Sequence, residues 1–287
     1  MATLSTQRSR SILLIHATLV VLSIVFLVPL VWMISTSLKP IELTMKDPPV
    51  WIPPHLQFQN YWDAIKYDSD ELGYIPFLLY ARNTILLCFL VVVGTVASNA
   101  VVAYSFARLR WPGRDAAFVI TLATMMVPFP VLMVPLFTLF RDLGWVGTYR
   151  PLWVPAWFGA AFNIFLLRQF FRSLPFELSE AARIDGCSEW KILIDIILPL
   201  SKPALAVVAL FAFMATWNDF LGPLIYLIDQ KSFTLSQGLQ FYQSQTGGAK
   251  WNLLMAASTI VIAPVLVLFF FTQRLFIQGI AVTGLKG

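Results

Sequence analysis

The sequence has little charge. Asp, Glu, Lys and Arg make up 12% of its 287 residues, whereas an average soluble domain has about 25%. This charge density cannot cover a water-facing surface of that size, and 58% of the residues are hydrophobic. A disordered chain and a nucleic-acid-binding protein are both excluded. The composition therefore indicates an integral membrane protein.

Residues that carry chemistry are also scarce. The two cysteines, Cys88 and Cys187, are too few for a disulfide scaffold. The two histidines, His16 and His55, are too few for a histidine-rich metal site. The patterns G-x-x-x-x-G-K-[ST], H-E-x-x-H, C-x-x-C and G-x-S-x-G do not occur. We therefore expect no catalytic residue, no metal site and no cofactor in this chain, so a partner must supply the energy for any uphill transport.

Long runs without charge are the main positive signal. A membrane-spanning helix needs roughly 20 apolar residues, and lipid cannot satisfy free backbone groups, so such runs must be helical. Alternating ten-residue patterns typical of a membrane barrel are absent. We predict an all-α protein, one transmembrane domain over residues 1–287, with six spans at about 12–38, 76–107, 116–140, 151–170, 203–228 and 251–273.

The distribution of basic residues predicts the orientation. With six spans, both termini lie on one side, together with residues 108–115 and 168–202. That side carries 12 Lys and Arg, and the other side carries 8. Because Lys and Arg accumulate in cytoplasmic loops, we expect both termini to be cytoplasmic. The first apolar run is longer than the core of a cleaved signal peptide and has no A-x-A site after it, so it should remain as an anchor.

Proline marks two regions whose role stays open. The segment 39–75 is rich in proline and aromatic residues, so it is not one long helix. It is either a loop at the membrane interface or a docking surface for an external partner. Prolines inside the predicted spans, such as Pro128, Pro155 and Pro264, free backbone carbonyls that need other partners. They indicate either static kinks or a broken helix that lines a path.

The longest predicted cytoplasmic loop, residues 171–202, reads as two short helices around a glycine. Glu177 and Glu180 suit the start of the first helix. Gly186 fits the left-handed position that ends it, and Ser188 fits the capping position of the second. An apolar face follows at helical spacing, formed by Ile192, Leu193, Ile196 and Ile197. Small residues before a tight turn allow another protein to approach the backbone closely.

This loop carries a resemblance to a known family. Glu180-Ala181-Ala182, Gly186, Ile196 and Leu198-Pro199 match the pattern E-A-A-x3-G-x9-I-x-L-P at every position. That pattern is similar to the signature loop of binding-protein-dependent ABC importer permeases, which docks onto their ATPase subunits. The segments 217–224, 251–258 and 273–287 further resemble the second, six-span permease of the maltose type. The resemblance runs from about residue 12 to 287 and departs from many relatives at Cys187, where they have alanine.

The resemblance implies a type I importer permease fold and a location in a bacterial or archaeal cytoplasmic membrane. It implies that Glu180, Ala181, Ala182, Asp185, Gly186, Leu198 and Pro199 couple the chain to the ATPase subunits. The expected partners are a second permease, two ATPase subunits that hold ATP and Mg²⁺, and an external solute-binding protein. The expected substrate is a sugar or oligosaccharide.

Asp219 is the one acid deep inside a predicted span. Such residues are costly in lipid and usually face the bundle interior or a wet cavity. If residues 203–228 form one helix, Asp219 shares a face with Asn218 and Tyr226. These residues and Trp217 offer the amide, carboxylate and aromatic groups that bind sugars. The same small, polar face also suits contact with the second permease, so the set predicts either a substrate path or a subunit interface.

Three rival functions fit the sequence less well than a sugar importer permease. A permease for glycerol-phosphate, phosphonate or polyamine keeps the mechanism, but an anionic substrate calls for a buried Arg or Lys, and none lies deep in a predicted span. An intramembrane enzyme needs a nucleophile or metal set at depth, and the sequence offers none. A secondary transporter commonly shows an inverted repeat, which is not visible, and does not need the loop motif.

Overall fold

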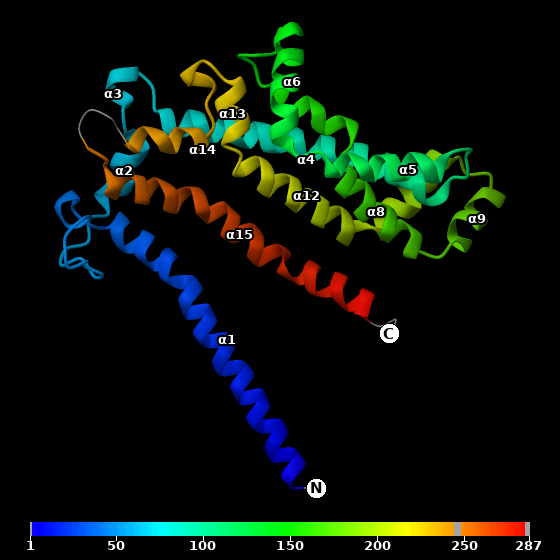
Figure 1. Cartoon of the computed structure of the whole chain (residues 1–287), viewed down its shortest axis with the longest axis horizontal. Coiled ribbons are helices and arrows are strands. Elements are labelled where there is room, and N and C mark those ends of the chain that lie inside the picture. Colours follow the sequence, from blue (N-terminus) through cyan, green and yellow to red (C-terminus); the bar gives the residue numbers. More distant parts are fainter. Residues whose placement is uncertain (1, 244–247, 285–287) are drawn as a thin grey trace. The chain divides into compact units, whose positions relative to one another are not determined.

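The computed structural model describes residues 2–243 and 248–284, with side chains for residues 12–243 and 248–273. Every regular element in this part of the chain is a helix, as the apolar runs predict (Figure 1). The chain divides into two units. The first comprises Met1–Pro76 and Leu239–Pro264, and the second comprises Phe77–Gly238 and Val265–Gly287. Helix α15 (Trp251–Gly284) contributes to both units.

The first unit is organised around the buried side chain of Asn60. Its amide group donates hydrogen bonds to the carbonyls of Ser37 (2.8 Å) and Lys39 (2.9 Å), at the end of α1 (Ala2–Ser37). Its amide oxygen accepts one from Asn252 (3.1 Å), at the start of α15. The other elements are η1 (Ile41–Leu43), α2 (Gln59–Lys66), α3 (Ser69–Leu72) and η6 (Leu239–Gln243). As its prolines predict, the segment 39–75 contains only short helices.

The second unit is built on α4 (Pro76–Arg108). Small residues on α4, including Ala100, Ala103 and Ala107, form a core with residues of α8, the 171–202 loop and α12 because they let neighbouring helices approach closely. The ring of Trp157 occupies the space that a side chain at Gly94 would need. In chain order the other elements are α5 (Arg114–Ala123), η2 (Thr124–Met126), α6 (Phe129–Asp142), α7 (Arg150–Trp153), η3 (Val154–Phe158), α8 (Ala161–Ser173), α9 (Glu177–Ile184), α10 (Glu189–Ile192), η4 (Leu193–Ile197), α11 (Leu198–Leu200), α12 (Lys202–Trp217), α13 (Leu221–Tyr226), η5 (Gln230–Ser232) and α14 (Leu235–Gly238).

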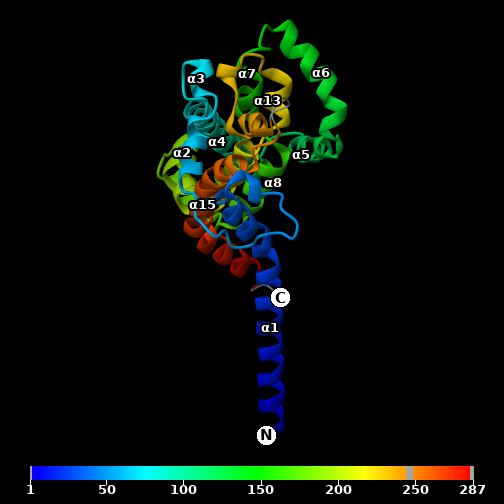
Figure 2. The ribbon, with the colours of Figure 1, turned by 90° about the vertical axis from the view of Figure 1, so that its left-hand side faces the viewer.

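Three of the predicted spans are continuous helices, and three are interrupted. Ile12–Ser37, Pro76–Arg108 and Trp251–Gln273 are long and apolar enough to cross a membrane. The predicted span 116–140 is bent by 98° between Arg114–Met126 and Phe129–Asp142, where Pro128 lies (Figure 2). The predicted spans 151–170 and 203–228 are each divided into shorter helices. The count of six spans therefore stays a prediction. Three of the six are continuous helices long and apolar enough to cross a membrane.

The break in the predicted span 151–170 has its free backbone groups satisfied by α4. Gly159 adopts φ +91° between η3 and α8. The hydroxyl of Ser98 donates to the carbonyl of Ala156 (3.0 Å), and the amide oxygen of Asn99 accepts from the backbone N–H of Ala160 (2.7 Å). A broken helix at membrane depth is tolerated where protein groups replace the missing hydrogen bonds. Hydropathy alone could not predict this break, because its partners lie about 60 residues away.

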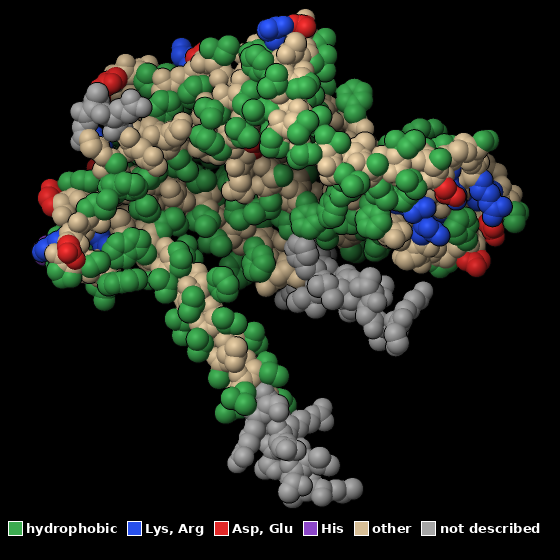
Figure 3. Space-filling view, viewed as in Figure 1, with side chains coloured by type: hydrophobic (Ala, Val, Ile, Leu, Met, Phe, Trp, Pro, Cys, Tyr) green, Lys and Arg blue, Asp and Glu red, His purple; other side chains and the backbone are tan. Residues whose placement is uncertain are grey.

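In Figure 3, charged side chains of the second unit are seen at the end where α5 and α9 lie, at the tip of α6 and at the loop after α13. Hydrophobic side chains cover most of the surface between them. The exposed apolar residues of this unit include Phe89, Val119 and Phe162. This arrangement suits a protein whose middle lies in lipid and whose two ends meet water.

Candidate functional site

The first helix of the 171–202 loop, α9, ends in the turn that the sequence predicts. Gly186 has φ +78°, a conformation that glycine adopts without a Cβ penalty. Its N–H donates to the carbonyl of Arg183 (3.0 Å), and the N–H of Cys187 donates to the carbonyl of Ala182 (2.9 Å). This pair of bonds is the Schellman motif, which satisfies the last carbonyls of a helix. A Cβ built on Gly186 would have no atom within 4 Å, so this backbone faces open space.

The second helix begins at the predicted cap. The hydroxyl of Ser188 accepts a hydrogen bond from the backbone N–H of Lys191 (3.3 Å). The helix continues through the π-helical turn η4, and the predicted apolar face packs inward. Ile192 and Ile197 have no exposed surface, and Leu193 is also buried. The face therefore holds the loop on the core formed by α4, α8 and α12.

A single carboxylate joins both halves of the loop to α4. Glu189 Oε1 accepts from Arg183 Nε (2.6 Å), and Glu189 Oε2 accepts from Arg183 Nη2 (3.3 Å). The hydroxyl of Tyr104 on α4 donates to the same Oε2 (2.5 Å). The hydrogen bond from Arg183 lowers the pKa of the Glu189 carboxyl, and the bond from Tyr104 acts in the same direction. Glu189 is therefore ionised at neutral pH.

Arg108, one turn further along α4, anchors the start of the loop. Its guanidinium donates to the carbonyls of Phe171 (2.7 Å), Leu174 (2.8 Å) and Pro175 (3.2 Å), at and beyond the end of α8. It also lies 4.6 Å from the ring centroid of Phe176, where α9 begins. Carbonyls at a helix C-terminus lack intrahelical partners and favour a nearby cation. This buried arginine therefore fixes where α9 begins.

The predicted coupling residues divide into an exposed set and an inward set. Glu180, Ala181, Asp185, Gly186 and Pro199 are exposed, Leu198 is half-buried, and Ala182 is buried. The two adjacent alanines thus have different roles. Ala182 lets α9 pack closely on the core of its own chain. Ala181 presents only a methyl group on the exposed side of α9. Two large apolar side chains nearby, Ile184 (86% exposed) and Trp190 (62% exposed), point away from the core.

The second candidate set lies at a break in the chain, which corrects the prediction of one helical face. Helix α12 ends at Trp217 and α13 begins at Leu221, so Asn218, Asp219 and Tyr226 do not share the face of one helix. Asp219 Oδ1 accepts a hydrogen bond from the backbone N–H of Gly222 (3.0 Å). Its carboxylate therefore caps the start of α13. A Cβ on Gly222 would collide with that carboxylate, so the glycine is needed there.

The other members of this set differ in exposure. Trp217 is buried and stacks on Phe213, with ring centroids 5.3 Å apart. Tyr226 is buried against Phe137 and Phe140. Only Asn218 is exposed, and its amide group donates to the carbonyl of Met214 on its own helix (2.8 Å). The structure thus brings these residues to one break without forming a shared polar surface.

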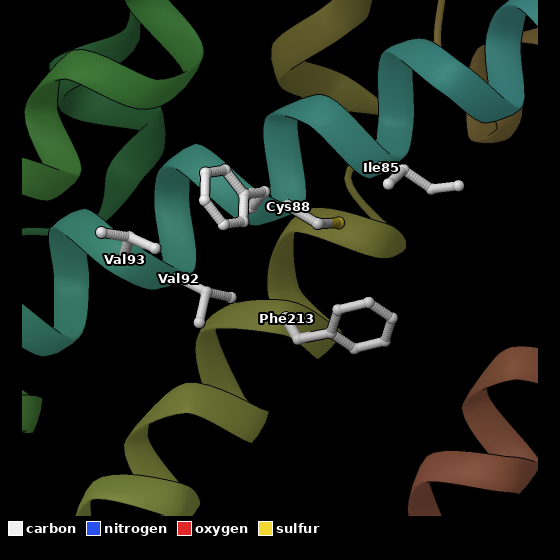
Figure 4. A pocket seen from close by; sticks show the side chains of 6 residues that line it. Ile85, Cys88, Val92, Val93 and Phe213 are labelled. Atoms are coloured by element: carbon white, nitrogen blue, oxygen red, sulfur yellow. The ribbon is translucent and has the colours of Figure 1, made fainter.

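An open apolar hollow of about 280 Å³ lies between α4 and α12 (Figure 4). It is lined by Ile85, Cys88, Phe89, Val92, Val93 and Phe213. The thiol of Cys88 is the one hydrogen-bonding side-chain group in this lining. The hollow therefore offers a polar solute little except apolar contact.

Comparison with protein families identifies the chain. Residues 99–282 match the family model described as "Binding-protein-dependent transport system inner membrane component". The match covers more than half of the chain and includes the whole 171–202 loop and the 217–226 break. The chain belongs to this family. It is accordingly a multi-pass protein of the inner membrane and a transport subunit, which confirms the predicted class and location.

Relatives agree along nearly the whole length of this permease. The arabinooligosaccharides transport system permease protein AraQ of Halalkalibacterium halodurans is 36% identical, over 90% of this chain and 91% of its own. The trehalose/maltose transport system permease protein MalG of Thermococcus litoralis is 34% identical, over 97% of each chain. A crystal structure of a bacterial ABC transporter for alginate import matches the fold with TM-score 0.80 at 24% identity, over 92% of this chain and 96% of that one.

The residues that sequence reasoning missed in this permease are those that hold the loop in place. The sequence motif of the loop includes none of Glu189, Tyr104 and Arg108. A basic residue at the end of α4 was a weak signal for Arg108. Nothing local in the sequence marks Tyr104, because its partner is 85 residues away. Among the described residues, no group of three or more His, Cys, Asp or Glu side chains is placed to hold a metal ion.

Proposed function

We propose that this chain is the permease subunit of an ABC importer that carries a sugar or oligosaccharide across the cytoplasmic membrane. It pairs with a second permease, so that the two surround one path. Two ATPase subunits bind ATP and Mg²⁺ on the cytoplasmic side, and a solute-binding protein delivers the solute from outside. The chain crosses the membrane six times, has both termini in the cytoplasm and itself does no covalent chemistry.

The observation that carries this proposal is the exposed surface from Glu180 to Gly186. Ala181 contributes only a methyl group to this surface, and a Cβ built on Gly186 would have no atom within 4 Å. The exposed side chains of Ile184 and Trp190 flank the surface. The Schellman turn orders its backbone, and the carboxylate of Glu189 binds the side chain of Arg183. A surface that combines small residues with large exposed apolar side chains suits docking of another protein. We assign the ATPase subunit to this surface, because the loop lies at the α5 and α9 end of the second unit, where charged side chains gather (Figure 3) and which the basic residues predict to be cytoplasmic.

The relatives support a sugar as the substrate. The names of several of them specify an oligosaccharide or disaccharide, among them the diacetylchitobiose uptake system permease protein NgcG of Streptomyces coelicolor, 32% identical over 90% of this chain. Asn218 at the 217–226 break is the one exposed polar member of the predicted path set. We assign it, together with Trp217, Asp219 and Tyr226, to the substrate path or to the interface with the second permease.

A glycerol-phosphate permease is the second candidate, because one relative is the sn-glycerol-3-phosphate transport system permease protein UgpE of Yersinia pestis, 32% identical over 92% of this chain. An anionic substrate needs a free cation in the path. Among the side chains that the structure describes, the two buried arginines of the second unit have other roles. Arg108 binds carbonyls at the end of α8, and Arg168 donates to the carbonyl of Phe106 and lies over the ring of Phe118. This favours a neutral solute.

The substitution Gly186→Val tests the coupling role. Valine at φ +78° strains the turn, and its branched side chain occupies the space that the ATPase surface needs. We expect solute-stimulated ATP hydrolysis to be abolished or the ATPase subunit to be released, with the permease still inserted. Glu180→Gln is expected to have a milder effect in the same direction. The complete transporter, reconstituted with its binding protein, is assayed for stimulated hydrolysis and uptake.

Gly144→Val is the matched control, because Gly144 also has a positive φ (+67°) and open space around it but lies outside the loop. It imposes the same kind of backbone strain without touching the proposed surface. Full coupling in Gly186→Val would overturn the assignment. An equal defect in Gly144→Val would attribute the loss to strain in general.

A further inference from the structure

Two side chains of α4 contact the two halves of the coupling loop (residues 171–202). Tyr104 reaches the second half through Glu189, and Arg108 holds the carbonyls that precede the first half. They are four residues apart and therefore lie on the same side of the helix, one turn apart. Helix α4, a continuous helix from Pro76 to Arg108, thus meets the loop at two neighbouring points.

Glu189 is where these contacts converge. One carboxylate accepts from Arg183 at the end of α9 and from Tyr104 on α4, while Glu189 itself belongs to α10. Three helices are therefore joined at one group. Hydrogen bonds to an ionised carboxylate are shorter and about twice as strong as neutral ones, and these two are 2.6 and 2.5 Å long.

We propose that Glu189 is a positioning residue that locks α9 to α10 and, through Tyr104, to α4. When a partner displaces the exposed surface of α9, the lock makes the loop and α4 move as one body. This inference rests on the proposed coupling role of the loop, and it adds the route by which the displacement reaches a membrane-spanning helix. Arg108 supports the same route by holding the point where α9 begins.

The fold of the loop does not depend on this lock. The buried side chains of Ile192, Leu193 and Ile197, together with Ala182, pack into the core. The Schellman turn consists of backbone hydrogen bonds, and the cap at Ser188 uses the serine hydroxyl, so neither involves the side chain of Glu189. Removing the Tyr104 hydroxyl should therefore leave the loop folded and the exposed surface of α9 unchanged. A defect in transmission is thus separable from a defect in docking.

The test uses the complete transporter, reconstituted with its ATPase subunits and binding protein, and the variants Tyr104→Phe, Glu189→Gln and the double variant. We expect the ATPase subunits to be retained and basal hydrolysis to continue. The solute transported per ATP hydrolysed should fall by up to about fivefold, the factor that corresponds to about 1 kcal/mol for a partly exposed contact. Because both residues act through one contact, the double variant should be no worse than Glu189→Gln.

Two variants serve as controls. Tyr149→Phe removes the hydroxyl of a half-buried tyrosine outside the loop, and Asp115→Asn removes one carboxylate of an exposed ion pair with Arg114. Both should transport solute as the wild type does. Arg183→Lys keeps the charge but loses the forked geometry, so its ratio of solute to ATP should lie between those of the wild type and Glu189→Gln.

The outcomes separate this inference from the proposed function. A wild-type ratio of solute to ATP in both Tyr104→Phe and Glu189→Gln, with coupling lost in Gly186→Val, overturns the lock alone. Full coupling in Gly186→Val as well overturns the docking role of the loop. Loss of the ATPase subunits in Tyr104→Phe or Glu189→Gln also overturns the lock, since it places these residues in docking. Additive defects in the double variant contradict action through one contact.

Discussion

In the coupling loop and at the 217–226 break alike, two helices are joined by a non-helical turn. In the loop, Gly186 ends the first helix and Ser188 caps the second. At the break, α12 ends at Trp217 and the carboxylate of Asp219 caps α13. The two segments differ in surroundings. The loop lies among charged residues, whereas the break lies in a predicted span with apolar neighbours.

This difference explains why the sequence predicts the helix ends of the loop but not the helix ends at the 217–226 break. In a polar loop, glycine, serine and acidic residues are read as helix ends, because that is their commonest role there. In an apolar run, the same kind of residue is read as a functional group, because lipid makes any acid costly. At Asp219 the acid has a local structural role. A carboxylate that binds backbone N–H groups lowers the cost of breaking the helix, whatever else it does.

The largest effect should separate the two adjacent alanines of the loop. Ala182→Leu places extra volume in a packed core and should destabilise the permease by about 1–3 kcal/mol. Ala181→Leu adds the same atoms on the exposed side and should change stability by less than about 0.5 kcal/mol. Thermal unfolding of the purified permease measures both. Equal destabilisation would show that α9 does not pack as described.

The same pair also sharpens the docking proposal. Ala181→Leu adds a bulky side chain to the surface that the ATPase subunit is proposed to contact. The substitution should therefore weaken retention of that subunit although the permease remains stable. Co-purification of the ATPase subunit measures this effect. Normal retention and normal coupling in Ala181→Leu would show that this face of α9 is not in close contact with a partner.

The next effect concerns the cap at the break. Asp219→Ala leaves the N–H of Gly222 without its acceptor and should cost about 0.5–2 kcal/mol. Asp219→Asn keeps an acceptor oxygen and should restore most of that stability. If uptake fails in the asparagine variant while the complex is intact and stable, the charge of Asp219 acts on the solute. If both variants transport normally once folded, capping is its whole role.

Asn218→Ala is the matched substitution beside it. The exposed amide of Asn218 bonds only to a carbonyl of its own helix among the described residues, so its loss should hardly affect stability. Reduced uptake with intact assembly would place the break in the path, and loss of the second permease would place it in the interface. Normal uptake and assembly would remove Asn218 from both.

Much of the fold follows from the sequence, because apolar runs and caps are local signals. The spans 12–38, 76–107 and 251–273 appear as continuous helices, and the loop motif appears with its predicted turn and cap. The interruption at residues 218–220 was not predicted, and the one at Gly159 was predicted only as a kink or a broken helix near Pro155. Their backbone groups are satisfied in part by distant side chains, such as Asn99 for Ala160, and no single-sequence pattern encodes that pairing.

The candidate site was predictable to the same extent. The exposed residues of the motif are adjacent in the sequence, so their spacing alone identifies them. The residues that hold the loop are not adjacent, since Tyr104 and Arg108 lie more than 60 residues before their partners. The inward packing of Ala182 against the outward exposure of Ala181 was also invisible, because both are small and the sequence does not state which side of α9 faces the core.

The smallest effect concerns the ionisation of Glu189. The hydrogen bond from Arg183 lowers the pKa of this carboxyl below its ordinary value of 4.5. A carboxyl whose pKa is lower in the folded state stabilises that state above its unfolded pKa, and the contribution is lost as the pH falls through the folded pKa. The stability difference between the wild type and Glu189→Gln should therefore be constant between pH 6 and 8 and vanish only below about pH 4.5. Because the side chain of Glu189 is 40% exposed, water screens the pair and the difference should be less than about 1 kcal/mol.

Thermal unfolding of the wild-type and Glu189→Gln permeases across this pH range measures the difference, with Asp115→Asn as the control for an exposed pair. A difference that already disappears between pH 6 and 8 would show that Glu189 is not held as an ionised group by Arg183 and Tyr104, and the loop would then lose the contact that most clearly distinguishes it from the 217–226 break.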